Sequence, residues 1–312
     1  MTLSYGASTV NGPAVVSDPG RRDEGGESVS ELSGLLDVLK LEEVEPGRYR
    51  AQNFGEGPGM VVFGGQLLAQ AVVAAATVDP GKEVKSLHTI FARGAAIDKA
   101  LDVDVDVMQS GRAFASATVT FSQEGRLCCR SLALLSAAEP DLIRHALPLP
   151  VTDGPEQAAA SSHGGSWWEI RTVDGVDISD PDAVGPAELS VWIRFPGAPD
   201  DLTTNRALLA YATDGFLIGT AMRPHPGVGQ ALSHVTISTT VLTHTLTFHE
   251  PFDAGSWLLL AQESPYAGRG RSYGRGNVFT EDGRLVASFV QENMIRDFPE
   301  DQRPQAGERS RH

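Results

Sequence analysis

The sequence lacks several features that would assign a protein to a class at once. Among 312 residues there are only two cysteines, Cys128 and Cys129, and they are adjacent in the chain. Because neighbouring strand residues point to opposite faces, no disulfide between them is expected. So few cysteines are typical of a reducing compartment, and we therefore expect a cytoplasmic protein.

Long apolar runs and an excess of basic residues are also missing. No run of about 18 apolar residues occurs, so no membrane span is predicted, and no signal peptide is visible. The chain has 25 Lys and Arg against 40 Asp and Glu, a formal net charge of -15. Because phosphate contacts need clustered Lys and Arg, neither nucleic acid nor an anionic membrane is an expected partner.

What the chain does contain is an internal repeat. The segment "LLAQAV" at 67 returns as "LLAYAT" at 208, and "FSQEGRL" at 121 returns as "FTEDGRL" at 279. The first pair lies in helices that are apolar nearly all round, 63–80 and 203–222, and such helices must be buried. Segments with strand periodicity follow each helix. The sequence therefore predicts an α+β fold in which two curved antiparallel sheets each wrap a helix and join side by side.

Composition divides the chain into five segments. The two repeats account for two folded units, and a Pro-, Ala-, Gly- and Ser-rich stretch between them reads as a linker that is partly ordered around its tryptophans. The ends are polar and without periodicity, which favours disorder. The predicted segments are a tail at 1–30, a first unit at 31–137, a linker at 138–187, a second unit at 188–298 and a tail at 299–312.

Several strings in this order resemble one enzyme family. They are "VFGGQLLAQA", "VWIRFPGAPDDL", "LLAYATDGFL", "TFHEPF" and "FTEDGRLVASFVQE", spread from about Leu32 to Phe298. Together they are similar to the acyl-CoA thioesterase II family, which has a double hot-dog fold. The resemblance implies hydrolysis of acyl-CoA to a free acid and coenzyme A, a place in fatty acid metabolism, and no cofactor. No metal is expected, because His244 and His249 are five residues apart on a strand and face opposite sides, and the remaining histidines lack ligand spacing.

The two halves differ at two interior positions. Asp214 of the second helix stands where the first helix has Val73, and Gln291 of the last strand stands where the first half has Ala133. A polar group at a buried position costs free energy, so it is retained when it is paired or does chemistry. The alternative for Asp214 is a cap at a kink before Gly215, because Asp-Gly is a common turn pair.

The resemblance assigns catalytic roles to three positions. In the family a helix Asp, a Thr or Ser on the next strand and a Gln on the last strand orient the water that attacks the thioester. Asp214 and Gln291 match, but the hydroxyl position holds Val241. We take Thr243 as the first substitute, since it should share a strand face with Val241, and Thr240 as the second, which faces away unless a bulge intervenes. A run of threonines is equally typical of an exposed strand.

Three further residues are candidates for substrate binding. Gly64 and Gly65 begin the first helix, where open backbone N–H groups could stabilise an oxyanion, or where small residues could allow tight packing. His88 matches a histidine of the family, and either pocket lining or a satisfied core position would explain it.

Two other functions compete with hydrolysis by an oriented water. The absent hydroxyl at Val241 would fit a degenerate protein that only binds acyl thioesters. A hot-dog hydratase or dehydratase would use an Asp/His pair, and neither central helix carries a His. Self-association into a homo-oligomer is compatible with the sequence, which does not fix it.

Overall fold

The computed structural model describes residues 31–55, 60–161, 163–165 and 167–298. The two predicted tails, 1–30 and 299–312, lie outside the described residues. In the part that is described, no helix is long and apolar enough to cross a membrane.

The first half follows the predicted order of a helix and then strands. The stretch that ends at Ala51 is a hairpin of two short strands. The elements are α1 (Glu31–Val38), β1 (Glu42–Glu45), β2 (Arg48–Ala51), α2 (Gly64–Ala76), β3 (Glu83–Phe91), β4 (Leu101–Ser110), β5 (Phe114–Gln123) and β6 (Arg126–Ser136).

The second half repeats this order with additions at its start. Its elements are β7 (Ala159–Ala160), β8 (Glu169–Thr172), a 3-10 turn η1 (Val173–Gly175), β9 (Glu188–Arg194), α3 (Leu202–Thr213), α4 (Leu217–Met222), a 3-10 turn η2 (Gln230–Leu232), β10 (Ile237–Phe248), β11 (Leu258–Gly268), β12 (Arg271–Thr280) and β13 (Leu285–Asp297).

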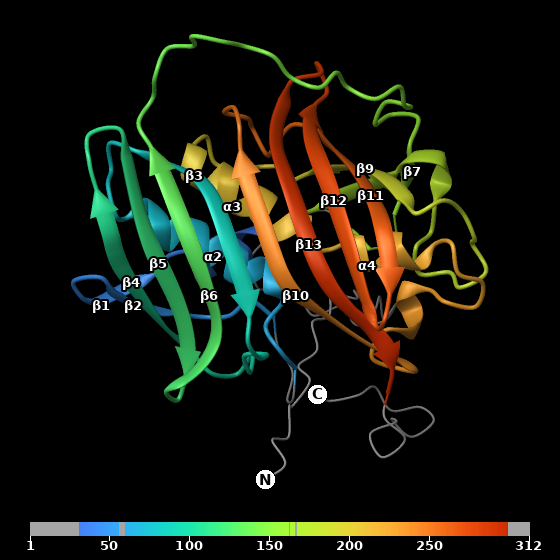
Figure 1. Cartoon of the computed structure of the whole chain (residues 1–312), viewed down its shortest axis with the longest axis horizontal. Coiled ribbons are helices and arrows are strands. Elements are labelled where there is room, and N and C mark those ends of the chain that lie inside the picture. The colour runs from blue at the N-terminus through green and yellow to red at the C-terminus, as the bar shows by residue number, and fades with distance from the viewer. Residues whose placement is uncertain (1–30, 56–59, 162, 166, 299–312) are drawn as a thin grey trace, which may run out of the picture.

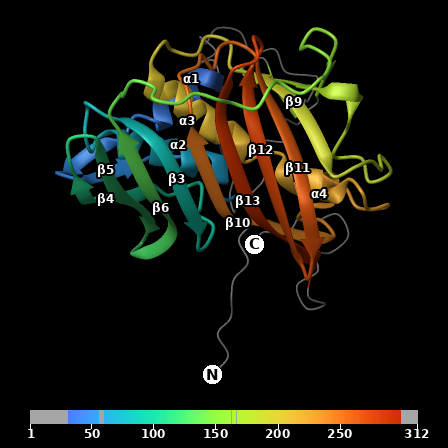
Figure 2. The same cartoon turned by 45° about the horizontal axis from the view of Figure 1, so that its top comes forward.

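All the described strands form one sheet, in the order β1-β2-β4-β5-β6-β3-β10-β13-β12-β11-β9-β8-β7. The two halves join where β3 pairs antiparallel with β10. Figures 1 and 2 show α2 and α3 on the same side of the curved sheet. The face of the sheet that covers these helices is called the inner face below. The predicted arrangement, two helices each wrapped by an antiparallel sheet, is present.

Helix α2 has no polar face because it is enclosed. Nearly all of its residues are buried, including its only polar ones, Gln66 and Gln70. Both glutamines bind the backbone that precedes the helix: Gln66 accepts from the Phe54 N–H at 2.8 Å, and Gln70 donates to the Val38 carbonyl at 2.9 Å. These bonds pair amide groups whose burial without partners would be costly, although Gln70 Oε1 has no partner among the described residues.

The second apolar segment is two helices, where the sequence predicted one over 203–222. Helix α3 begins at an N-cap, since Asp201 accepts from the Thr204 N–H at 2.8 Å. It ends at Thr213 with Asp214 as its C-cap, and α4 starts at Leu217. The Asp-Gly pair thus makes a turn inside the apolar segment, which sets Asp214 at the break.

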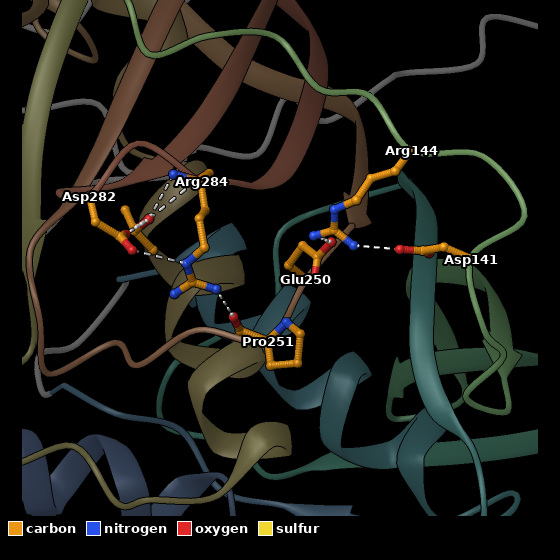
Figure 3. Close-up of polar contacts among 7 residues, drawn as sticks. Asp141, Arg144, Glu250, Pro251, Asp282 and Arg284 are labelled. Atoms are coloured by element: carbon orange, nitrogen blue, oxygen red, sulfur yellow. Dashed lines mark hydrogen bonds and ion pairs between the residues drawn. The ribbon is translucent and has the colours of Figure 1, made fainter.

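The segment predicted as a linker contributes to the second half. Strands β7 and β8 lie within it, and β8 pairs with β9 at the edge of the sheet. Trp168 is buried and stacks on Phe195 with ring centroids 5.8 Å apart. Figure 3 shows Arg144, on the stretch before these strands, between Asp141 and Glu250, at 2.6 and 2.9 Å. Such exposed ion pairs contribute little free energy, so burial of the tryptophan is the stronger attachment.

Candidate active site

Asp214 is the polar residue around which the candidate site is built. Its side chain is buried, 6% exposed, at the break between α3 and α4. One carboxyl oxygen, Oδ1, accepts a hydrogen bond from Gln291 Nε2 at 2.7 Å. The backbone N–H of Gly65 also donates to this carboxyl group. The other oxygen, Oδ2, has no hydrogen-bond partner among the described residues. The structure therefore brings together Asp214 and Gln291, 77 residues apart in the chain.

The glycines of α2 make room for this carboxyl group. A Cβ atom on Gly64 would lie 2.5 Å from Asp214 Oδ2, too close for any side chain. A Cβ atom on Gly65 would overlap the carbonyl oxygen of Tyr211 in α3 and come within 2.5 Å of the Phe63 ring. The first turn of α2 thus packs against the end of α3, so close packing of the glycines is confirmed. It also aims the open N–H groups of a helix N-terminus at the site.

Burial changes the acidity of Asp214. Loss of hydration raises the pKa of its carboxyl group from 3.8 to about 8, against the lowering effect of the bonds from Gln291 and Gly65. Aromatic rings help exclude water here: Trp168 packs edge-on against both Tyr211 and Phe216, which flank Asp214 in the chain. A carboxyl group that titrates near neutral pH is suited to proton transfer.

Gln291 is placed by β13, whose residues alternate between the two faces of the sheet. It is 1% exposed and stands opposite Gly274 of β12. A Cβ atom on Gly274 would lie 2.8 Å from Leu217, so α4 packs directly on that glycine. The amide oxygen Oε1 of Gln291 is buried and has no partner among the described residues. It and Asp214 Oδ2 are therefore two acceptors available at one site.

Neither threonine proposed as the third catalytic residue reaches this site. A β-bulge lies between Val241 and Thr243 in the pairing of β10 with β13. It leaves Val241 on the inner face, whereas Thr243 pairs with the exposed residues Glu292 and Ile90 on the outer face. The expectation that Thr243 shares a face with Val241 is wrong, because the extra residue reverses the alternation. Thr240 directly precedes Val241 and lies on the opposite face.

His88 also lies away from the site. It is exposed on the outer face of β3, where its Nδ1 is 3.3 Å from Thr245 Oγ1. Both interpretations drawn from the sequence, a pocket residue and a core residue, therefore fail. The inward neighbour of His88 on β3 is Thr89, which is 2% exposed and shares a hydrogen bond of 2.7 Å with Ser131.

The sequence contains one Gly-x-Ser-x-Gly string, at Gly270–Gly274, the pattern of a nucleophilic serine. Ser272 lies inside β12, however, without the strand-to-helix turn that exposes such a nucleophile. Its hydroxyl accepts from Asn293 Nδ2 at 3.3 Å, and no histidine, lysine or carboxyl side chain of the described residues is hydrogen-bonded to it. This serine therefore has a structural role.

One inward-facing residue was missed by sequence reasoning. His244 is fully buried on β10, directly opposite Gln291. His244 and His249 are five residues apart and, as this spacing predicts for a strand, they lie on opposite sides, since His249 is exposed. The position of His244 opposite Gln291 follows from the register of β10 with β13. This register could not be predicted from the sequence, because the β-bulge after Val241 shifts it by one residue.

Comparison with known proteins identifies the family of this architecture. The model for the acyl-CoA thioesterase N-terminal domain matches residues 56–136, and that for the C-terminal domain matches residues 145–295. The chain is similar to acyl-CoA thioesterase 2 of Haemophilus influenzae, with 29% identity over 291 residues that cover 85% of this chain and 98% of that protein. Human acyl-coenzyme A thioesterase 8 is 28% identical over 290 residues, covering 84% and 89%.

Solved structures agree with these sequences. The acyl-CoA thioesterase II TesB2 from Mycobacterium marinum superposes with a TM-score of 0.73 at 29% identity, covering 86% of this chain and 99% of that one. A hot-dog protein of unknown function from Alicyclobacillus acidocaldarius gives 0.68 at 19% identity, covering 85% and 98%, and supports the fold alone. With the predicted double hot-dog fold confirmed and both domain models matched over most of its length, the chain belongs to the acyl-CoA thioesterase family.

Proposed function

We propose that this protein hydrolyses acyl-CoA thioesters to the free carboxylic acid and coenzyme A, and that Asp214 and Gln291 orient the attacking water. The observation that carries the proposal is the buried pair itself. The two side chains are joined at 2.7 Å, and each keeps one buried oxygen without a partner among the described residues. Buried acceptors that lack partners are costly unless a ligand or a water satisfies them.

The chemistry follows from these two acceptors. A water between them donates one hydrogen to Asp214 Oδ2 and the other to Gln291 Oε1, so that a lone pair points at the thioester carbonyl carbon. Asp214 in its ionised form takes a proton as the carbon–oxygen bond forms. The tetrahedral intermediate then breaks its carbon–sulfur bond, and the proton passes from Asp214 to the departing sulfur. The products are a carboxylic acid and a free thiol.

The negative charge on the carbonyl oxygen needs hydrogen-bond donors. The N–H of Gly64 lies in the first turn of α2, beside Asp214, and is the donor we assign to it. The Gly65 N–H already binds the Asp214 carboxyl group, so it holds the base in place and serves the oxyanion less. Backbone donors at a helix N-terminus are fixed before the reaction, which is what stabilises a transient charge.

Thiol release tests this function. Purified full-length protein is mixed with acyl-CoAs of graded chain length and a thiol-trapping reagent, in parallel with Asp214→Asn. We expect turnover at some chain length and a loss of at least about 10³-fold in the variant, since an amide cannot accept the proton. Binding of acyl-CoA with no thiol release at any length would favour the degenerate protein. Hydration of an enoyl thioester without thiol release would favour the hydratase.

The proposal also covers the location, metabolic role, assembly and domain organisation of the enzyme. We propose that the enzyme acts in the cytoplasm and in fatty acid metabolism, and that it self-associates into a homo-oligomer. We also propose that 31–137 and 188–298 act as the two hot-dog units and that the second provides the catalytic carboxyl group, with 138–187 connecting them.

A further inference from the structure

The inner face of β10 offers a residue that could replace the hydroxyl absent at Val241. His244 is 0% exposed and pairs directly with Gln291 across β10 and β13. Because directly paired residues project to the same face, the imidazole lies next to the Gln291 amide, which binds Asp214. Neither ring nitrogen has a side-chain hydrogen-bond partner among the described residues, and the ring lies near the backbone of Thr213.

The bulge at Leu242 is what brings His244 to this position. Val241 pairs with Asn293 and His244 pairs with Gln291, and all four are buried. On the inner face, His244 is thus the next residue after Val241, one step closer to Gln291. In a regular strand this place would belong to Thr243.

The imidazole is held in one orientation and in one charge state. Its ring stacks on Phe289 with centroids 6.0 Å apart and an interplanar angle of 6°. Burial lowers the pKa of His244 to about 4, against the raising effect of a polar contact with the backbone of Thr213, next to Asp214. The ring is therefore neutral near pH 7, with one N–H donor and one acceptor nitrogen.

The first half of the chain supplies an internal comparison. There Leu87 pairs with Ala133 on the neighbouring strand, just as His244 pairs with Gln291. The helix position that corresponds to Asp214 holds Val73. All three positions are apolar in the first half and polar in the second. A leucine packs well at this place, so a buried imidazole that serves only as core would lower stability without compensation.

A neutral imidazole and a hydroxyl can each donate one hydrogen bond to a water and accept one from it. Asp214 Oδ2 and Gln291 Oε1 are both acceptors, so they fix the two hydrogens of a water. The water can still turn about the line that joins these hydrogens, so the direction of its lone pairs is not fixed. One donor to a lone pair fixes the other toward the carbonyl carbon. Val241 provides no donor, and Thr240 and Thr243 lie on the outer face. Thr239 shares the inner face with Val241, but its hydroxyl lies 3.4 Å from His234 Nε2, on the side of Val241 away from Gln291.

We propose that His244 is a catalytic residue that donates a hydrogen bond to the attacking water, in the role that Val241 cannot fill. This inference rests on the proposed function, because it requires a water held by Asp214 and Gln291. A merely structural role for His244 would leave the rate unaffected by a hydroxyl restored nearby, which separates the two explanations.

The test compares variants of the full chain in the thiol-release assay. His244→Leu should lower kcat by about 100-fold or more with KM nearly unchanged, since removal of one oriented donor has an effect of this size. Val241→Thr adds a hydroxyl at nearly constant volume, and in the His244→Leu background it should restore kcat at least tenfold. In the wild-type background the same change should alter kcat less than threefold. His249→Gln, at an exposed histidine directly after the end of β10, is the matched control and should leave kcat unchanged.

Three results would overturn the proposal. The first is a His244→Leu variant within about twofold of the wild-type kcat. The second is an equal loss in the single and double variants. The third is a His244→Gln variant, which keeps an N–H donor, as inactive as His244→Leu while its thermal unfolding midpoint matches the wild type. Asp214→Asn is measured alongside: if it stays active, the proposed base is wrong, whereas failure of the His244 variants alone leaves the base intact.

Discussion

Burial of Asp214 predicts that Asp214→Asn stabilises the fold increasingly as the pH rises. The carboxyl group has a pKa of about 8 in the folded protein and an ordinary value of 3.8. A group with a raised folded pKa favours the folded state fully below its unfolded pKa, and that advantage is lost as the pH rises through the folded value. The cost of ionising Asp214 therefore accumulates between about pH 4 and pH 8.

The magnitude follows from the same two pKa values. Each pH step in this window costs about 1.4 kcal/mol, so the full difference between wild type and variant approaches roughly 6 kcal/mol above pH 8. The asparagine amide resembles the protonated acid, and its oxygen still accepts from Gln291, so the variant avoids the cost. The wild type should thus lose stability relative to Asp214→Asn as the solution becomes more alkaline.

Urea unfolding of both proteins at several pH values between 5 and 9 measures this difference. Asp106→Asn, at an exposed carboxyl group on β4, is the matched control, and its difference from wild type should stay nearly constant. A free-energy difference for Asp214→Asn that does not change between pH 5 and pH 8 would refute the reasoning, because it would mean that the carboxyl group is hydrated in the folded protein.

Two further predictions concern the glycines of α2. Gly65→Ala should lower the free energy of unfolding by about 1–3 kcal/mol, because its Cβ would overlap the backbone of α3; an unchanged urea midpoint would contradict this. Gly64→Ala meets only the Asp214 side chain and the Phe91 ring. It should therefore lower kcat at least tenfold with a smaller loss of stability than Gly65→Ala, and full activity would show that the carboxyl group has room to move.

Much of the fold could be predicted from periodicity and from the repeat. The enclosed helix α2, the strand segments and the joining of two similar halves all follow from apolar patterns that extend over ten residues or more. Local irregularities could not be predicted in this way. The break after Thr213 could be expected only as an alternative, from the Asp214-Gly215 pair, and β8 is a four-residue strand between β7 and β9 in a Pro- and Gly-rich stretch.

The candidate site divides along the same line. Asp214 and Gln291 stand out because the other half of the chain has Val73 and Ala133 in their places, a comparison that needs no structure. Thr243 was placed on the wrong face because a single extra residue in a strand exchanges inside for outside. His244 escaped notice for the same reason, since its contact with Gln291 depends on pairing between strands.

The pH dependence of kcat/KM tests whether Asp214 is the base. With uncatalysed thioester hydrolysis subtracted, kcat/KM of the wild type should rise with pH through one apparent pKa near 8 and then level off, as the free carboxyl group ionises. The residual activity of Asp214→Asn should lack this rise. A wild-type profile that is flat between pH 6 and pH 9, or the same rise in Asp214→Asn, would contradict a mechanism in which this buried carboxylate activates the water.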